Sequence, residues 1–516
     1  MKKRSNSVII AILLFLSFLL PISCETGNPG GEDAPKIVSY ELQLVQEGKT
    51  VSVDGEIDHA ERTITVTPAS QKWIDNIGSA VAIFHLENAE KISAGGIPQE
   101  SGLSENDFTS DVLYTLKDKN GLEREYTVIL RSPQSTGLPV ISIFTEGGAP
   151  VTDKENYIGA TVSISNASDP AHDISGEPAG IRGRGNTTWK YDKKPYRIKF
   201  DKKTSLFGLG KAKSWVLLAN YLDPTFITGT VAFEIGRRMD IPFTNHTNHA
   251  ELFLNGTYLG SYVLTEQVQV NEHRINIDEE MDWLLELDSY FDEDFKFRSG
   301  LLQLPVNIKS PELGELDPAE ASATMAEIRS AFNEMEYMLF SEDFPGNGYR
   351  EIIDIYSVID YLLANEIVRN AEIIHPKSVF MYKTESGRFR LGPLWDFDWG
   401  FGYNGNGSGF NYFEKETQVF SPGQDDLGLP GYRFFLRFFD DPHFRSEYKK
   451  RWNEVKAYLV NIGDYIDSQG ASLERSAEEN KKAWSYYRAD MPAEVKRMKE
   501  WQRKRIDDLD AAINGF

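Results

Sequence analysis

The chain has 516 residues, of which 41% are hydrophobic and 26% are charged, and its formal net charge is -23. Its length predicts roughly two to four domains, and its composition is ordinary for globular protein. The strong negative charge argues against nucleic acid as a partner, because a phosphate backbone would be repelled.

The N-terminus has a basic start, an apolar run from Val8 to Leu20, and then the only cysteine of the chain, Cys24. The run is short for a membrane span and typical of a signal peptide, which we predict to be residues 1–23. A sole cysteine where a lipoprotein signal is cut favours lipidation of Cys24 over a chance cysteine at this place. We therefore expect an exported protein that is lipid-anchored at the outer membrane or cell surface and meets the membrane only through this anchor. With one cysteine, no disulfide is expected.

The next two segments are predicted to be a tether and a small β-domain. Residues 24–35 are rich in Gly, Pro and acidic residues, which is typical of a flexible tether. Residues 36–133 contain short alternating runs such as IVSYELQLV and EYTVILR, separated by turn pairs such as Asn120-Gly121. This pattern predicts an all-β sandwich without catalytic residues. The segment resembles the Ig-like modules of Bacteroidetes surface lipoproteins, and residues 131–139 are predicted to be a linker.

Residues 138–516 are predicted to form an α+β domain. Strand patterns such as VISIFT, PYRIKF and SWVLLAN come first, and longer helical patterns follow. We expect helices over residues 225–239 and 354–370, a third where large apolar residues recur from Phe444 to Leu459, and a last one from Val495 to Leu509. A domain that is rich in sheet first and in helix last belongs to the α+β class.

A cationic cluster lies between Arg182 and Lys199. Arg182 and Arg184 are two residues apart beside glycines, and in PYRIKF the alternation places Arg197 and Lys199 on the face opposite the core. In so acidic a protein, this cluster indicates either a solvated strand face that pairs with nearby carboxylates or a phosphate site. Glycines favour the phosphate site, because they let backbone N–H groups approach an anion while the side chains supply charge.

The segment LGPLWDFDWGFG places Asp396 and Asp398 two residues apart among aromatic residues. If the segment is extended, both carboxylates share one face. Aspartates aimed into a pocket are typical ligands of Mg²⁺ or Mn²⁺, which keep substrate phosphates as further ligands. The alternative is a structural turn with capped aspartates.

Several motifs occur in a family order: RGRGNTTW…KKPYRIKF, SWVLLANYLDPT, LFLNGTYLGSYVLTEQV, LLELD, NIKSPE, HPKSVFMYK and GPLWDFDWGFG. In order and spacing they resemble the spore-coat-protein-H (CotH) kinase family, over roughly residues 138–516. The resemblance implies an atypical protein-kinase-like domain in which Lys199 holds nucleotide phosphates and Glu266 is the carboxylate partner of that lysine. It further implies that Asp396 binds the metal and that Asp398 is either a secondary ligand or a group that supports the ligands without binding the metal itself. Arg197 and Arg184 are the remaining candidates for nucleotide contact.

The chain departs from the family pattern at two catalytic positions. Glu372 stands where the family has its catalytic Asp, and Ser378 stands where it has a metal-binding Asn. The resemblance implies a kinase that binds ATP with Mg²⁺ or Mn²⁺ and phosphorylates protein Ser or Thr, with Glu372 as the catalytic acid. The departures leave a second hypothesis open, in which the domain is catalytically inactive and binds a protein partner or a glycan through the aromatic-rich segment WGFGYNGNGSGF.

Overall fold

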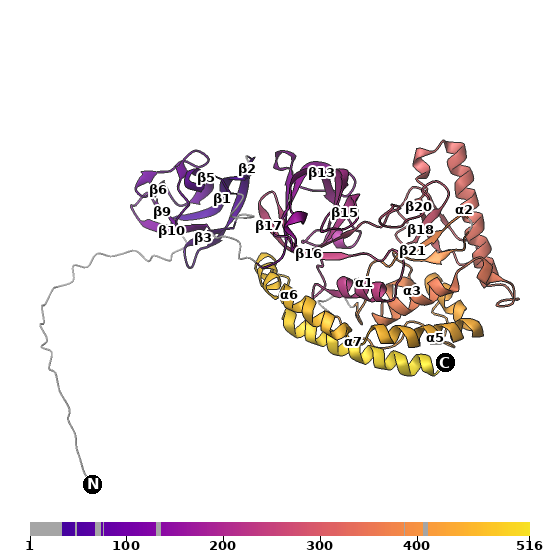
Figure 1. Ribbon diagram of the computed structural model, residues 1–516. Coiled ribbons are helices and arrows are strands. Elements are labelled where there is room, and N and C mark those ends of the chain that lie inside the picture. The colour runs from indigo at the N-terminus through magenta and orange to yellow at the C-terminus, as the bar shows by residue number, and fades with distance from the viewer. Residues whose placement is uncertain are drawn as a thin grey trace, which may run out of the picture. The chain divides into compact units, whose positions relative to one another are not determined.

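The computed structural model describes residues 34–46, 49–67, 74–75, 77–130, 136–385, 387–405 and 411–516. The predicted signal peptide, Cys24 and nearly all of the predicted tether lie outside these residues, so those predictions stay open. No described helix is both long enough and apolar enough to cross a membrane. The chain divides into a smaller unit, mainly residues up to 131, and a larger unit that includes residues 132–516 (Figure 1).

The smaller unit is all-β in its described residues. Its hydrogen-bonded strand order is β7-β6-β9-β10-β3-β2-β1-β5-β8, and β4 pairs with β1. The bounds are β1 Lys36–Gln46, β2 Lys49–Asp58, β3 Thr63–Val66, β4 Ile74–Asp75, β5 Ala80–Glu87, β6 Lys91–Ala94, β7 Ile97–Pro98, β8 Glu105–Asn106, β9 Val112–Lys117 and β10 Glu123–Leu130.

Ring contacts show that this sheet folds over into two layers. Tyr40 of β1 and Phe84 of β5 meet Tyr114 of β9 edge to face, with ring centroids 6.0 and 6.2 Å apart. β1 and β9 are not neighbours in the strand order, so the contact joins distant parts of the path. The all-β character that the alternating pattern predicts is therefore present ahead of the larger unit.

The larger unit begins with a closed barrel in the order β11-β12-β13-β14-β15-β17-β16. Tyr196, Ile198 and Phe200 of β14 are buried in its core, as the alternation in PYRIKF predicts. The bounds are β11 Val140–Thr145, β12 Ile158–Ser165, β13 Ile174–Gly183, β14 Tyr196–Thr204, β15 Ala212–Leu218, β16 Thr247–Leu254 and β17 Thr257–Glu266.

A five-stranded sheet follows, in the order β19-β20-β18-β21-β22. Its strands are β18 Trp283–Leu287, β19 Lys296–Arg298, β20 Pro305–Ser310, β21 Val379–Lys383 and β22 Arg390–Leu391. The helices are α1 Thr228–Arg238, α2 Pro318–Leu339, α3 Ile355–Ile367, α4 Pro430–Leu436, α5 Pro442–Tyr458, α6 Ile462–Ala483 and α7 Met491–Asn514. Together these elements confirm the α+β class.

The helix starts follow from local chemistry. Asp317, Asp354, Asp441 and Asp490 precede α2, α3, α5 and α7, and each side chain accepts a hydrogen bond from a backbone N–H of the first turn. Figure 1 shows α6 and α7 side by side, and α6 packs against β17 of the barrel. The long C-terminal helices therefore connect the barrel to the helical part of the unit.

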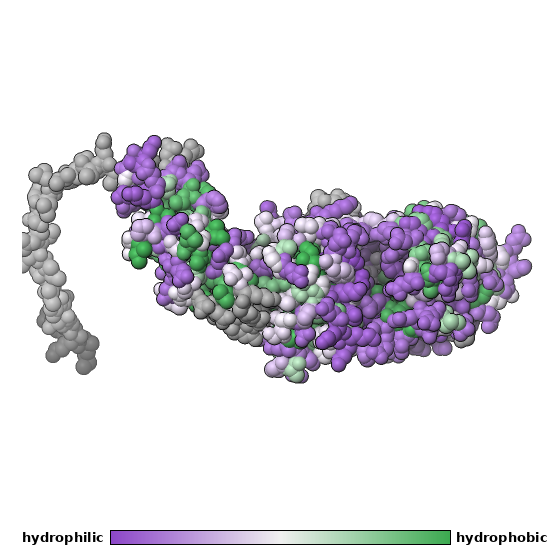
Figure 2. Space-filling model, turned by 90° about the horizontal axis from the view of Figure 1, so that it is seen from above, coloured by the Kyte–Doolittle hydropathy of each residue, from purple (hydrophilic) through white to green (hydrophobic). Residues whose placement is uncertain are grey.

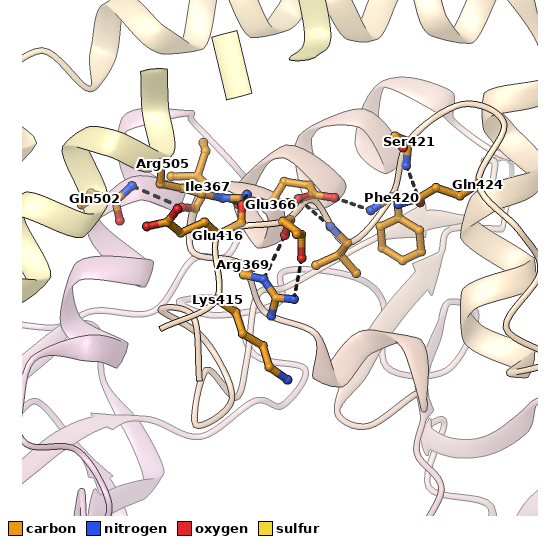
Figure 3. Close-up of polar contacts among 12 residues, drawn as sticks. Glu366, Ile367, Arg369, Lys415, Glu416, Phe420, Ser421, Gln424, Gln502 and Arg505 are labelled. Carbon is orange, nitrogen blue, oxygen red and sulfur yellow. Dashed lines mark hydrogen bonds and ion pairs between the residues drawn. The ribbon is translucent and has the colours of Figure 1, made fainter. Parts of the chain in front are cut away.

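A buried ion pair joins α7 to α3 and to the segment that follows Asp396 and Asp398 (Figure 3). Arg505 and Glu366 are each 1% exposed, and Arg505 Nη2 donates to Glu366 Oε2 at 2.6 Å. The same carboxylate accepts from the backbone N–H groups of Val419 and Phe420, at 3.2 and 2.6 Å. One carboxylate thus fixes the chain about 20 residues beyond Asp398 against two helices.

Candidate functional site

A cleft of about 480 Å³ lies between the barrel and the five-stranded sheet of the larger unit. Figure 2 shows a recess on the upper face, surrounded mostly by hydrophilic residues. The barrel contributes the ends of β13, β14 and β15, and the opposite side comes from β18, β20 and the loops around β21 and β22. The cleft therefore lies where the predicted cationic strands face the predicted aspartates.

The barrel wall of the cleft is cationic. Arg182 of β13 and Arg197 of β14 are opposite each other in the strand register, and Arg184 follows β13 directly. The guanidinium of Arg184 lies over the Trp395 ring at 5.5 Å from its centroid. Among the described residues, none of these arginines forms an ion pair. Burial lowers the pKa of Arg184 and of Arg197, so each is a desolvated cation without a carboxylate partner.

The opposite wall carries the two predicted aspartates. Asp396 has a left-handed φ of 59°, which breaks the extended conformation expected for WDFDW. Its backbone carbonyl accepts from Asn370 Nδ2 at 3.0 Å, and its Oδ2 accepts from Ser378 Oγ at 3.4 Å. Desolvation raises the pKa of Asp396. Asp398 is more exposed, and desolvation by the cleft walls together with the charge of Asp396 raises the pKa of Asp398 to about 7.

Glu372 lies in the same cleft, in a short 3₁₀ helix from Glu372 to Ile374. Its side chain is 6% exposed; Oε1 is 3.4 Å from Lys377 Nζ, and Oε2 is buried without a hydrogen-bond partner. Desolvation, with the charges of Asp396 and Asp398, raises the pKa of Glu372 to about 9. The carboxyl group therefore carries a proton at neutral pH unless a cation enters the cleft.

Two predicted nucleotide residues lie elsewhere. Lys199 is exposed, stands over the Tyr157 ring at 6.0 Å from its centroid, and is not part of the cleft wall. Glu266 accepts from the backbone N–H of His246 at 2.7 Å and does not pair with Lys199. Lys199 shares a face with Arg197, but it lies opposite Gly180, farther along the strand than the cleft reaches. The structure therefore separates Lys199 and Glu266 from each other and from Asp396.

Several charged residues of the cleft have no role in the sequence prediction, and three of them come from motifs that the resemblance includes. Glu286 and Asp288 come from LLELD, and Lys309 comes from NIKSPE. Lys309 pairs with Glu293 and lies 3.4 Å from Glu286. Burial raises the pKa of Glu286 to about 7. The available signal was an apolar strand carrying two acids two residues apart, the same pattern that drew attention to Asp396 and Asp398.

Aromatic residues surround the Glu372 side of the cleft. Trp399 stacks on Tyr403 with centroids 6.1 Å apart, and Lys377 Nζ lies 4.6 Å from the centroid of the Trp399 ring. Both rings are partly exposed. Residues 406–410, which complete the predicted glycan segment, lie outside the described residues.

The donor groups fit a hard divalent cation that shares its coordination with a ligand. No group of three or more His, Cys, Asp or Glu side chains in the described part of the chain is arranged to hold a metal ion alone. However, Asp396 offers carboxylate oxygen, and Glu372 Oε2 is a buried acceptor without a partner in the same cleft. Mg²⁺ is typically held by one or two carboxylates and completed by phosphate oxygens and water.

Comparison with known proteins gives one family match. The family model described as CotH kinase protein matches residues 181–509. No curated protein matches the chain. Among solved structures, a predicted secreted protein from Bacteroides fragilis NCTC 9343 is 15% identical with a TM-score of 0.13, covering 19% of this chain and 93% of that one. A DUF4623 family protein from Bacteroides eggerthii DSM 20697 is 10% identical with a TM-score of 0.14, covering 32% of this chain and 47% of that one. TM-scores this low carry no argument about fold.

Proposed function

The chain belongs to the CotH kinase protein family, and on that basis we propose that its cleft binds ATP with Mg²⁺ or Mn²⁺ and transfers a phosphoryl group to a protein hydroxyl. The observation that carries this proposal is that arginines without ion pairs lie on one wall of the cleft and desolvated carboxyl groups lie on the other. Arg182, Arg184 and Arg197 lack carboxylate partners on one wall, and Asp396 and Glu372 crowd together on the other. A polyphosphate with a divalent cation neutralises both walls at once.

In this proposal the cleft residues have different roles in binding and catalysis. Arg184 and Arg197, which the sequence prediction names as nucleotide candidates beside Lys199, bind phosphate oxygens, and Lys199 does not. Asp396 holds the cation, which when bound neutralises charge on the phosphates. Glu372 would accept a hydrogen bond from the acceptor hydroxyl and take its proton; the bound cation, together with Lys377, would favour the carboxylate form that this step requires.

A second candidate function is binding without catalysis. Glu has one methylene more than the family's Asp, and a shift of about 1 Å at a catalytic group costs roughly a hundredfold in rate. The partly exposed Trp399–Tyr403 stack beside the cleft suits a glycan or a protein side chain. In this case nucleotide and metal give no response, whereas a glycan or partner does.

We also propose that the mature chain is exported and lipid-anchored through Cys24. The support is the signal-like segment that ends at the only cysteine. Replacement of Cys24 by Ala should move the protein from the membrane fraction to the soluble fraction. Unchanged membrane association would contradict the anchor.

Thermal stability in the presence of ATP and Mg²⁺ or Mn²⁺ tests the nucleotide site. A ligand at a hundredfold excess over its dissociation constant stabilises the fold by about 2.7 kcal/mol. Arg184→Met should remove most of this stabilisation, and Asp396→Asn should remove its metal-dependent part. Lys199→Met is the matched control, because it removes an exposed cation outside the cleft and should leave the response unchanged. A wild-type protein that is folded but shows no response would refute the proposal.

A further inference from the structure

Resting on the proposed metal–nucleotide site, we propose that Asp288 is the second carboxylate ligand of the divalent cation, in place of Asp398. Asp288 is the first residue after β18 and lies in the cleft wall. The strand register places it beside Ser378, because Leu287 pairs with Val379 at the start of β21. The neighbouring strands β18 and β21 thus bring it to the residue that also contacts Asp396.

Ser378 connects the two carboxylates. Its backbone N–H donates to Asp288 Oδ2 at 3.1 Å, and its Oγ donates to Asp396 Oδ2 at 3.4 Å. A left-handed φ of 49° at Ser378 sets these two directions. The other oxygen of Asp288, Oδ1, accepts from the backbone N–H of Tyr290 at 2.7 Å. Two backbone donors therefore hold the Asp288 carboxylate in a fixed orientation next to Asp396.

Burial distinguishes Asp288 from Asp398. Asp288 is 7% exposed, and no described Lys, Arg or His forms an ion pair with it. A carboxylate that is desolvated without a cation is costly, and backbone N–H groups compensate only in part. Asp398 is exposed, and it contacts Asp396 through its backbone N–H, 3.5 Å from Asp396 Oδ1, not through its carboxylate. Asp398 is the more exposed of the two residues, so a bound metal relieves less of a desolvation cost there than at Asp288.

An independent observation points to a ligand at this place. Glu372 is 6% exposed, lines the same cleft, and leaves Oε2 without a hydrogen-bond partner. A buried carboxyl oxygen of this kind calls for a hydrogen-bond partner or a cation that the protein itself does not supply. Asp288 also explains how the site could bind a metal with Ser at position 378. The Asp288 carboxylate, directly after β18, would replace the ligand oxygen that the family's Asn supplies at that position.

Mn²⁺ binding in the presence of a non-hydrolysable ATP analogue tests the assignment without any activity measurement. Electron paramagnetic resonance of free Mn²⁺ gives the affinity for wild type, Asp288→Asn, Asp398→Asn and Asp396→Asn. We expect Asp288→Asn and Asp396→Asn each to weaken Mn²⁺ binding at least tenfold, since loss of even an outer-shell partner typically costs 10–100-fold in metal affinity. The Mn²⁺ affinity of Asp398→Asn should stay within about twofold of the wild-type affinity. Asp288→Glu, which keeps the charge, should bind Mn²⁺ more tightly than Asp288→Asn.

The outcomes separate this inference from the proposed function. If wild type binds Mn²⁺ and Asp398→Asn loses it while Asp288→Asn keeps it, the ligand assignment is wrong and the metal site remains. If wild type binds neither Mn²⁺ nor nucleotide, both proposals fail. Urea denaturation without metal checks folding: Asp288→Asn removes a buried charge but leaves one of the two backbone donors, Ser378 or Tyr290, without an acceptor, so its urea midpoint should fall only modestly. If it is strongly destabilised and Asp288→Glu binds Mn²⁺ no better, Asp288 is structural and the inference fails.

Discussion

Replacing Arg505 by Met should destabilise the larger unit by about 3–5 kcal/mol, the usual cost of removing one partner from a buried ion pair. Arg505 donates to Glu366 Oε2 at 2.6 Å, to the Glu366 carbonyl at 2.9 Å and to the Glu416 carbonyl at 2.5 Å. Methionine fills a similar volume and makes none of these bonds. The Glu366 carboxylate would stay buried with only two backbone N–H donors, from Val419 and Phe420.

The loss of stability should fall within this range because the three hydrogen bonds of Arg505 differ in what their loss costs. The Glu366 carbonyl keeps a second donor, the backbone N–H of Arg369 at 3.0 Å, so it is not left unpaired. The Glu416 carbonyl loses its guanidinium donor, which costs roughly 1–3 kcal/mol if it stays buried. The rest of the cost is the unpaired charge of Glu366 itself, whose pKa burial already raises despite the nearby charge of Arg505.

Urea denaturation followed by tryptophan fluorescence measures the loss, and hydrogen exchange locates it. Exchange should accelerate most at the amides of Val419 and Phe420, which share the carboxylate of Glu366. Arg503→Met is the matched control: it lies on the same helix, its side chain is 75% exposed, and its pair with Asp507 should be worth less than about 1 kcal/mol. If Arg505→Met costs no more than Arg503→Met, the buried pair does not hold this segment.

Three further predictions concern the barrel and the cleft. Ser378→Asn should stabilise the apo protein by up to about 1 kcal/mol, because Asn tolerates the left-handed φ of 49° better than Ser; unchanged urea stability would contradict this. Burial lowers the pKa of Lys193 from 10.5 to about 7. Between these two pH values the unfolded chain binds one more proton than the folded chain, so the free energy of unfolding should rise with pH. Lys193→Met should flatten that rise, and an equal rise in both proteins would refute the prediction. Asn186 Nδ2 donates to Asp292 across the cleft at 3.1 Å. Asn186→Ala removes this bond and should increase both the association and the dissociation rate of a fluorescent nucleotide by about two- to tenfold in stopped-flow measurements. Unchanged rates would show that the bond does not control access of the nucleotide to the cleft.

The sequence predicts best where one periodicity decides the structure. Alternation in PYRIKF correctly places Tyr196, Ile198 and Phe200 in the barrel core, and the helical pattern over residues 354–370 corresponds to α3, Ile355–Ile367. These assignments depend only on which face of an element is apolar. They need no knowledge of what packs against the other face.

The site is predicted less completely, because it depends on distance along a strand as well as on face. Arg197 and Lys199 share a face, but the cleft reaches only Arg197. Asp396 and Asp398 both line the cleft, yet the left-handed backbone at Asp396 separates their surroundings, which period-2 alternation does not describe. Asp288 comes close to Asp396 only because β18 pairs with β21 nearly 100 residues later in the chain.

The arrangement of Arg184 explains how unlike charges coexist in the cleft without neutralising each other. Its guanidinium lies over the Trp395 ring, and it forms no ion pair with the neighbouring Asp396, although each shifts the pKa of the other. A direct ion pair between Arg184 and Asp396 would weaken ligand binding, because the ligand would first have to break that pair. The Trp395 indole instead stabilises the Arg184 cation through a cation–π contact. Trp395, the residue directly before Asp396, therefore holds Arg184 without an ion pair, so that the charges of Arg184 and Asp396 both stay available to a phosphate ligand and a cation.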